Sequence, residues 1–158
     1  MKGLVSIVVM VLLSLFFVSS HSFAQHMHGG MGSSSMKMDT REVLVEGVKV
    51  TFQIMANEEH KKMLKDMKMK EDVEAGTTHN ITVMLKDQKS QKEITDAEIT
   101  MKVVDPKGKD QIKSMKFEGE MKSYDAYVTL PEKGKYQVIV LVKKGEQKIP
   151  AGIYYEVK

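Results

Sequence analysis

Apolar and polar side chains alternate with a period of two along most of the chain after residue 40. The alternating segments are 41–45, 48–54, 79–85, 97–103, 112–117, 124–130, 136–142 and 149–157. This period places every second side chain on one face of a β-strand, and the turn residues between segments favour antiparallel pairing. The pattern predicts a mainly β fold: an immunoglobulin-like antiparallel β-sandwich of seven or eight strands, with a closed barrel as the alternative.

One aromatic residue supports the sandwich. Tyr136 follows the predicted turn at Gly134 by two positions. In immunoglobulin-like domains a tyrosine at such a corner bonds through its hydroxyl to the backbone a few residues upstream. Tyr136 is therefore a candidate tyrosine corner.

A helical insertion at about 57–72 interrupts the period of two. Asn57 is a favourable N-cap residue, and the acidic residues that follow it suit the positive end of a helix. Lys68 and Lys70 suit the negative end. We therefore expect one short helix over roughly 58–70.

The N-terminal segment has the features of a signal peptide. Lys2 supplies positive charge, residues 4–18 are an almost unbroken apolar run, and Ser22 and Ala24 occupy the positions that signal peptidase reads. The alternative is a retained anchor, but the apolar run of about 15 residues is shorter than the ~20 that a spanning helix needs. We expect a signal peptide at 1–24, cleaved after about Ala24, and a periplasmic protein without a membrane span.

The remaining chain divides into two parts. Residues 25–40, here called the leader, contain glycine, serine, histidine and methionine without apolar periodicity, which predicts a flexible segment. Residues 41–158 contain the alternating segments, and we expect them to form one β-sandwich domain that includes the helical insertion.

Composition narrows the function. The formal charge is only +3, and basic residues are mixed with acidic ones, so the chain lacks the basic patch of a nucleic-acid binder. It contains no cysteine but 14 methionines. The absence of cysteine excludes disulfides and thiolate ligands, whereas methionine thioethers are soft ligands that suit copper(I). The alternative role for methionine is to fill the core.

The leader carries the first candidate metal site. Its histidines and methionines are His26, Met27, His28, Met31, Met36 and Met38. Imidazole suits copper(II) and thioether suits copper(I), so a mixed set can bind a copper ion in both oxidation states. Packing does not explain these residues in a flexible segment, although an incidental polar leader remains the alternative.

The predicted helix carries the second candidate site. Its candidate metal ligands are His60, Met63, Met67 and Met69. At 100° per residue the first three share a face with Leu64, and that face is either a soft-metal site or an amphipathic face that packs on the sandwich. Leu64 favours packing. Met69 falls on the opposite side of a helix that continues to Lys70, where burial does not explain it.

The second half of the chain resembles a known family. The residues that carry the resemblance are His79-Asn80-Ile81-Thr82-Val83 with Leu85 and Asp87, Ile94-Thr95-Asp96-Ala97, Asp105-Pro106-Lys107-Gly108, Tyr124-Asp125-Ala126 and Glu132-Lys133-Gly134-Lys135-Tyr136. They resemble the YtkA-like family of small exported domains, and the leader is similar to that of periplasmic copper-binding proteins. The resemblance implies an immunoglobulin-like fold and a link to copper or another heavy metal. Similar domains often have a second histidine where this chain has Asn80, which argues against a two-histidine site on that strand.

These observations predict a binding protein. The sequence contains no nucleophile elbow and no phosphate-binding loop, so we expect no enzyme. We expect a periplasmic soft-metal binding protein, with copper as the metal ion, that acts as a carrier, buffer or resistance accessory. The alternative is a non-metal immunoglobulin-like interaction module that binds an envelope protein partner.

Overall fold

The computed structural model describes residues 36–158, so the predicted signal peptide and most of the leader lie outside the described residues. The elements are β1 (Met38–Val45), β2 (Val48–Ala56), α1 (Asn57–Asp66), β3 (His79–Asp87), β4 (Glu98–Val104), β5 (Asp110–Ser114), β6 (Lys116–Glu118), β7 (Ser123–Val128), β8 (Gly134–Lys144) and β9 (Gln147–Val157). Within this part of the chain, no helix is long and apolar enough to cross a membrane.

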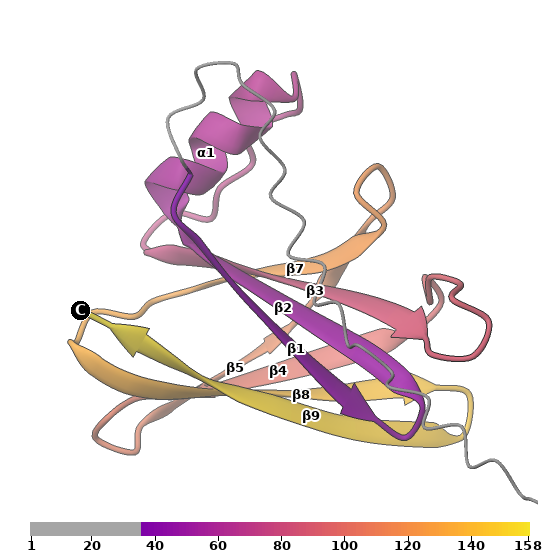
Figure 1. The fold of residues 1–158 in the computed structure, drawn as a ribbon. Helices are drawn as coiled ribbons and strands as arrows, with labels where there is room; N and C mark the ends of the chain where they lie inside the picture. The colour runs from indigo at the N-terminus through magenta and orange to yellow at the C-terminus, as the bar shows by residue number, and fades with distance from the viewer. Residues whose placement is uncertain (1–35) are drawn as a thin grey trace, which may run out of the picture. The chain divides into compact units, whose positions relative to one another are not determined.

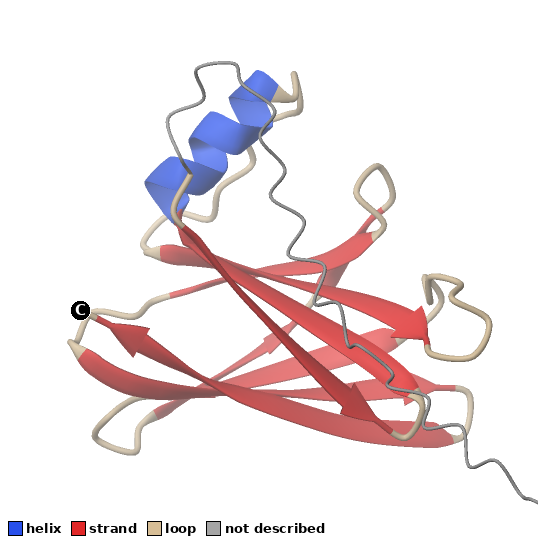
Figure 2. Cartoon of the chain, viewed as in Figure 1, coloured by secondary structure: helices blue, strands red, loops and turns tan. Residues whose placement is uncertain are grey.

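The strands form two antiparallel sheets that pack face to face (Figure 1, Figure 2). One sheet has the order β1-β2-β3-β7-β6 and the other has the order β5-β4-β8-β9. Without β1, these orders correspond to A-B-E-D and C′-C-F-G of an immunoglobulin-like domain. The predicted antiparallel β-sandwich is therefore confirmed, and the sheets of residues 36–158 do not close into a barrel.

The core lies between the inner faces of the two sheets. It is built by the alternating apolar positions, because a period of two directs them all to one side of each strand. The largest fully buried side chains include Phe52, Ile54, Ile81, Leu85, Met101, Tyr124, Tyr136 and Ile149. Burying an aliphatic or aromatic side chain of this size contributes about 1.5–3 kcal/mol, so burial stabilises the domain without disulfides.

The described residues form nine strands because the predicted strand 112–117 divides in two. β5 pairs with β4 in one sheet, and β6 pairs with β7 in the other. Met115 lies at the crossing, where it is 8% exposed and its amide donates to the carbonyl of Ile99. The alternation of apolar and polar residues does not predict such a crossing. It indicates which face of the strand a side chain lies on, but it does not indicate which strand pairs with it.

Tyr136 forms the predicted tyrosine corner. Its side chain is fully buried. Its hydroxyl donates to the carbonyl of Glu132 at 2.9 Å and accepts from the amide of the same residue at 2.9 Å. The prediction is confirmed, and the contact fixes the turn that leads into β8.

α1 begins directly after β2, and the insertion returns to the sheet at β3. The predicted N-cap at Asn57 is wrong: Ala56 is the N-cap residue and makes no side-chain cap. Asn57 instead joins the two ends of the insertion. Its backbone N–H donates to the carbonyl of Thr78 at 2.9 Å, and its side-chain Nδ2 donates to Thr77 Oγ1 at 2.8 Å. The helix is also shorter than predicted and ends at Asp66.

Candidate functional site

A groove of about 860 Å³ lies beside α1, over the outward-facing side chains of β7. Its walls come from α1, the chain after α1, the end of β5, β6, the β6–β7 turn and β7. The side chains with the most distinctive chemistry are His60, Met69, Met121, Asp125 and Tyr127. A smaller hollow of about 580 Å³ elsewhere is lined by no histidine or methionine, so the groove is the better candidate for a soft ligand site.

His60 is the buried imidazole of this groove. Its side chain is 2% exposed, and its ring packs edge-on against Tyr127 with centroids 5.6 Å apart. Its Nδ1 atom has no hydrogen-bond partner among the described residues. Burial lowers the pKa of His60 below its usual 6.5, so the imidazole is neutral at pH 7. A neutral imidazole with an unpartnered nitrogen is a competent metal ligand.

The end of α1 brings Met69 to the groove. Lys68 has a φ of +56°, its amide donates to the carbonyl of Lys65, and the amide of Met69 donates to the carbonyl of Leu64 at 2.8 Å. These bonds form a Schellman motif, which stops the helix and reverses the chain. Met69 and Leu64 consequently line the groove together. The predicted position of Met69 on the opposite side of a longer helix is therefore wrong.

Met121 enters the groove from the other side. It lies in the turn 119–122, which joins the paired residues Glu118 and Ser123 of β6 and β7. Lys122 closes this turn with a φ of +50°. Met121 is partly buried there, yet it is not packed against the hydrophobic core, and the same holds for Met69. Core filling therefore does not explain either thioether.

A chain of hydrogen bonds runs along the sheet beside the groove. Thr82 Oγ1 lies 2.5 Å from Asp125 Oδ1 and 2.9 Å from Asn80 Oδ1. A single hydroxyl proton cannot serve both acceptors. Burial and the neighbouring charge of Glu118 raise the pKa of Asp125. Two arrangements satisfy the count. Either a protonated Asp125 donates to Thr82, which then donates to Asn80, or the turned Asn80 amide donates from Nδ2 to Thr82, which then donates to Asp125.

Burial and negative charge act together on Tyr127 at this end of the groove. Burial, followed by the charges of Asp125, Asp72 and Glu118, raises the pKa of Tyr127 to about 12. The tyrosine is therefore neutral, and its phenolate is disfavoured at this point.

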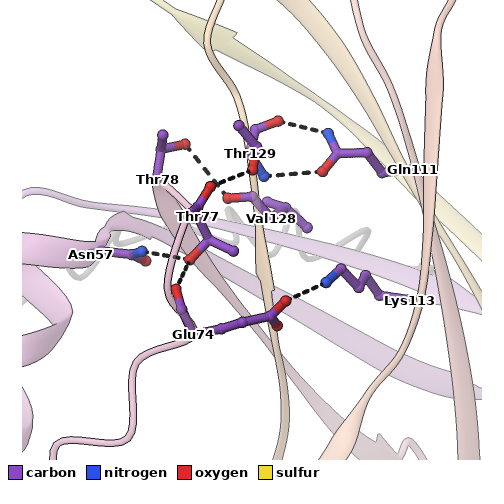
Figure 3. Close-up of polar contacts among 9 residues, drawn as sticks. Asn57, Glu74, Thr77, Thr78, Gln111, Lys113, Val128 and Thr129 are labelled. Atoms are coloured by element: carbon purple, nitrogen blue, oxygen red, sulfur yellow. Dashed lines mark hydrogen bonds and ion pairs between the residues drawn. The ribbon is translucent and has the colours of Figure 1, made fainter.

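The segment that carries Met69 is fastened to the sandwich at its far end (Figure 3). The hydroxyl of Thr77 donates to the carbonyl of Glu74 at 2.6 Å, and the Glu74 carboxylate pairs with Lys113 of β5 at 2.7 Å. Thr129, which follows β7, donates from its hydroxyl to the carbonyl of Gly76 at 3.1 Å. These contacts and the Schellman motif hold the segment at both ends.

The predicted metal ligands have different positions. His60 and Met69 line one groove, whereas Met63 is partly buried, Met67 is 52% exposed, and neither lines it. Met36 precedes β1 and Met38 begins it, and each is 41% exposed. The domain therefore starts before residue 41, because β1 includes the last residues of the leader. His26, Met27, His28 and Met31 lie outside the described residues.

Sequence reasoning missed three residues of the groove: Met121, Asp125 and Tyr127. Met121 could have been noticed in the sequence, because a methionine is unusual in a turn of glycine and charged residues. Asp125 and Tyr127 occupy the polar positions of an alternating strand and look like ordinary surface residues. Their role follows only from the helix that lies over them.

A site in the described domain needs thioether ligands. Between residues 36 and 158, no group of three or more histidine, aspartate or glutamate side chains is arranged to hold a metal ion. The groove combines one imidazole with two thioethers, and this combination suits a soft ion.

No protein-family model matches the chain, and no curated protein matches it. Solved structures are similar in fold. FetP from uropathogenic E. coli strain F11, expressed in the periplasm, has a TM-score of 0.52 and 12% identity over 76% of this chain and 94% of that chain. A DUF4426 family protein from Pseudomonas aeruginosa PAO1 has a TM-score of 0.55 and 14% identity over 75% and 94% of the two chains.

A copper-bound variant of the same FetP has a TM-score of 0.51 and 12% identity, and the match covers 77% of this chain and 96% of that chain. Identities this low show a common fold alone. The sandwich of this chain is therefore of the same kind as those of FetP and the DUF4426 protein.

Proposed function

We propose that the protein is a periplasmic soft-metal binding protein whose metal is copper, and that it acts as a carrier, buffer or resistance accessory. In this account the signal peptide directs the chain to the periplasm and the leader captures the ion. The sandwich supplies further ligands and a rigid frame. The role is binding, and it needs no catalytic group.

The observation that carries this proposal is the presence of His60 and Met69 on one groove. The imidazole is neutral and its Nδ1 has no partner among residues 36–158, and the thioether is uncharged and does not titrate. Ligands of this kind favour copper(I), whereas zinc favours thiolate, imidazole and carboxylate. Copper is therefore the metal that best fits the groove.

Two resemblances support the same function. FetP shares the fold, and one of its variants has been solved with copper bound. Residues 78–158 resemble the YtkA-like domains, and the leader is similar to those of periplasmic copper-binding proteins. Each likeness is distant, but both concern small exported β-sandwiches.

The proposal is tested with the untagged mature chain purified from the periplasm. Its copper(I) affinity is measured by competition with a chromophoric chelator. The comparison is the leader-substituted chain, which carries His26→Asn, His28→Asn, Met27→Leu, Met31→Leu, Met36→Leu and Met38→Leu. We expect stoichiometric binding by the mature chain and fewer bound ions in the leader-substituted chain. Inability of the mature chain to compete for copper(I) would refute the proposed function.

A second candidate function is an interaction module for an envelope protein. Ile112 and Tyr154 are 64% and 59% exposed, and both lie on the outer face of the four-stranded sheet. These side chains belong to the two edge strands β5 and β9, so an apolar binding surface that includes both would extend across β4 and β8. This function predicts that Ile112→Ser with Tyr154→Ser abolishes partner capture, whereas the leader substitutions leave it unchanged.

A further inference from the structure

We propose that Met121 joins His60 and Met69 as a ligand of a copper(I) site in the groove between α1 and the β6–β7 turn. This inference rests on the proposed function, because it assumes that the protein binds a soft metal. It adds Met121 as a ligand, locates the site in the groove, and excludes Met63 and Met67 as ligands.

The groove distinguishes these three side chains from Met63, which is also partly buried but does not line it. His60 is almost fully buried, and its Nδ1 has no partner within the described part of the chain. A buried polar atom without a partner costs about 1–3 kcal/mol, so an ion that binds it removes a penalty. Met69 and Met121 are partly buried in the same groove but do not pack against the core.

The fold places the three proposed ligands on the walls of one groove, from distant parts of the sequence. His60 lies on α1, Met69 follows a Schellman motif, and Met121 lies in a hairpin turn that also contains a residue with positive φ. Both thioethers are therefore held by defined backbone geometry. A methionine side chain has three rotatable bonds, so its sulfur can adjust to an ion between fixed backbones.

The chemistry of the ligands selects a monovalent soft ion. The three proposed ligands are neutral, and thioether ligands select copper(I) over zinc. The groove itself is lined by charges of both signs, from four lysines and five acidic residues. Among them, Asp125 on β7 has a pKa that is raised first by burial and then by the neighbouring charge of Glu118.

The test uses the leader-substituted chain, so that leader ligands do not mask the groove. Met121→Leu and Met69→Leu remove the sulfur and nearly conserve volume, so the fold is preserved. Met67→Leu is the matched control, because Met67 is exposed and lies outside the groove. Loss of a metal ligand should weaken copper(I) binding by at least about tenfold. Removing a residue that only hydrogen-bonds to a metal ligand already weakens metal binding by about that factor.

We expect Met121→Leu and Met69→Leu each to show this loss, and Met67→Leu to bind as the leader-substituted chain does. Unfolding curves establish that all three variants are equally folded. Equal affinity of Met121→Leu and Met67→Leu would overturn the site. So would the absence of copper(I) binding by the leader-substituted chain while the mature chain still binds. Both results leave the proposed function intact. That function is refuted only if the mature chain does not bind copper(I).

Discussion

At the scale of single residues, the outer face of the five-stranded sheet holds buried polar groups that compete for protons. Asn80 is fully buried, and its Nδ2 has no partner among residues 36–158. Thr82 is 5% exposed and lies between two acceptors. Such groups are costly in a metal-free protein. Turning the Asn80 side-chain amide about its χ2 axis lets Nδ2 donate to Thr82 and removes that cost.

Asp125→Asn should stabilise the metal-free domain at neutral pH. The raised pKa of Asp125 means that the folded state binds its proton more tightly than the unfolded state does. Stability is therefore fully present below the usual pKa of 3.8 and declines as pH rises through the folded value. The asparagine amide replaces the proton donor to Thr82 and has no charge to bury. Urea unfolding should show a higher midpoint for Asp125→Asn at pH 7 and no difference below pH 3.8.

The matched control for that experiment is Asp110→Asn. The Lys102 ammonium lowers the pKa of Asp110, so this substitution should not stabilise the domain at pH 7. A lower midpoint for Asp125→Asn than for the parent would show that the Asp125 carboxylate is stabilised in the folded state, contrary to our account.

At the scale of elements, the end of α1 decides where Met69 lies. A continuous helix to Lys70 is favoured by helix-forming residues and terminal lysines, and it would direct Met69 away from His60. The structure instead places Lys68 in the left-handed region, where glycine is the usual residue. No glycine marks this helix end, which is why the sequence pattern does not predict it.

Lys68→Gly should strengthen this helix end. A left-handed conformation costs a residue with a Cβ atom about 1–2 kcal/mol, and glycine removes that cost. We expect slower hydrogen exchange at the Met69 amide, which bonds to Leu64, and a gain of up to about 1 kcal/mol in unfolding free energy. Lys61→Gly in the middle of α1 is the control and should destabilise by about 1 kcal/mol. A faster Met69 exchange in Lys68→Gly would disprove the assigned motif.

At the scale of the whole molecule, the sandwich could be predicted from sequence because the alternation of apolar and polar residues identifies the side chains of each strand that face the core. Phe52, Val83, Met101 and Val138 all follow that rule, and Tyr136 identifies the corner before β8. The division at Met115 could not be predicted, because sheet membership depends on long-range pairing. The polar composition of the leader hid the start of β1, which begins at Met38 and not at residue 41.

The candidate site could be predicted only in part. His60 and Met69 were identified from their residue types, but their meeting depends on a helix end that the pattern did not show. Met121 lies 52 positions beyond Met69 in the sequence, and only the tertiary fold brings both to one groove. The leader ligands His26, Met27, His28 and Met31 stay predictions.

The most direct test of the central claim is a methyl NMR titration of the leader-substituted chain. Methionine methyl groups are labelled with carbon-13, each resonance is assigned from a single Met→Leu variant, and one equivalent of copper(I) is added. Direct thioether ligation changes the environment of the methyl group next to the sulfur. The account predicts that the Met69 and Met121 resonances shift together while those of Met63 and Met67 do not. Shifts of Met63 and Met67, or no shift of Met121, would contradict it.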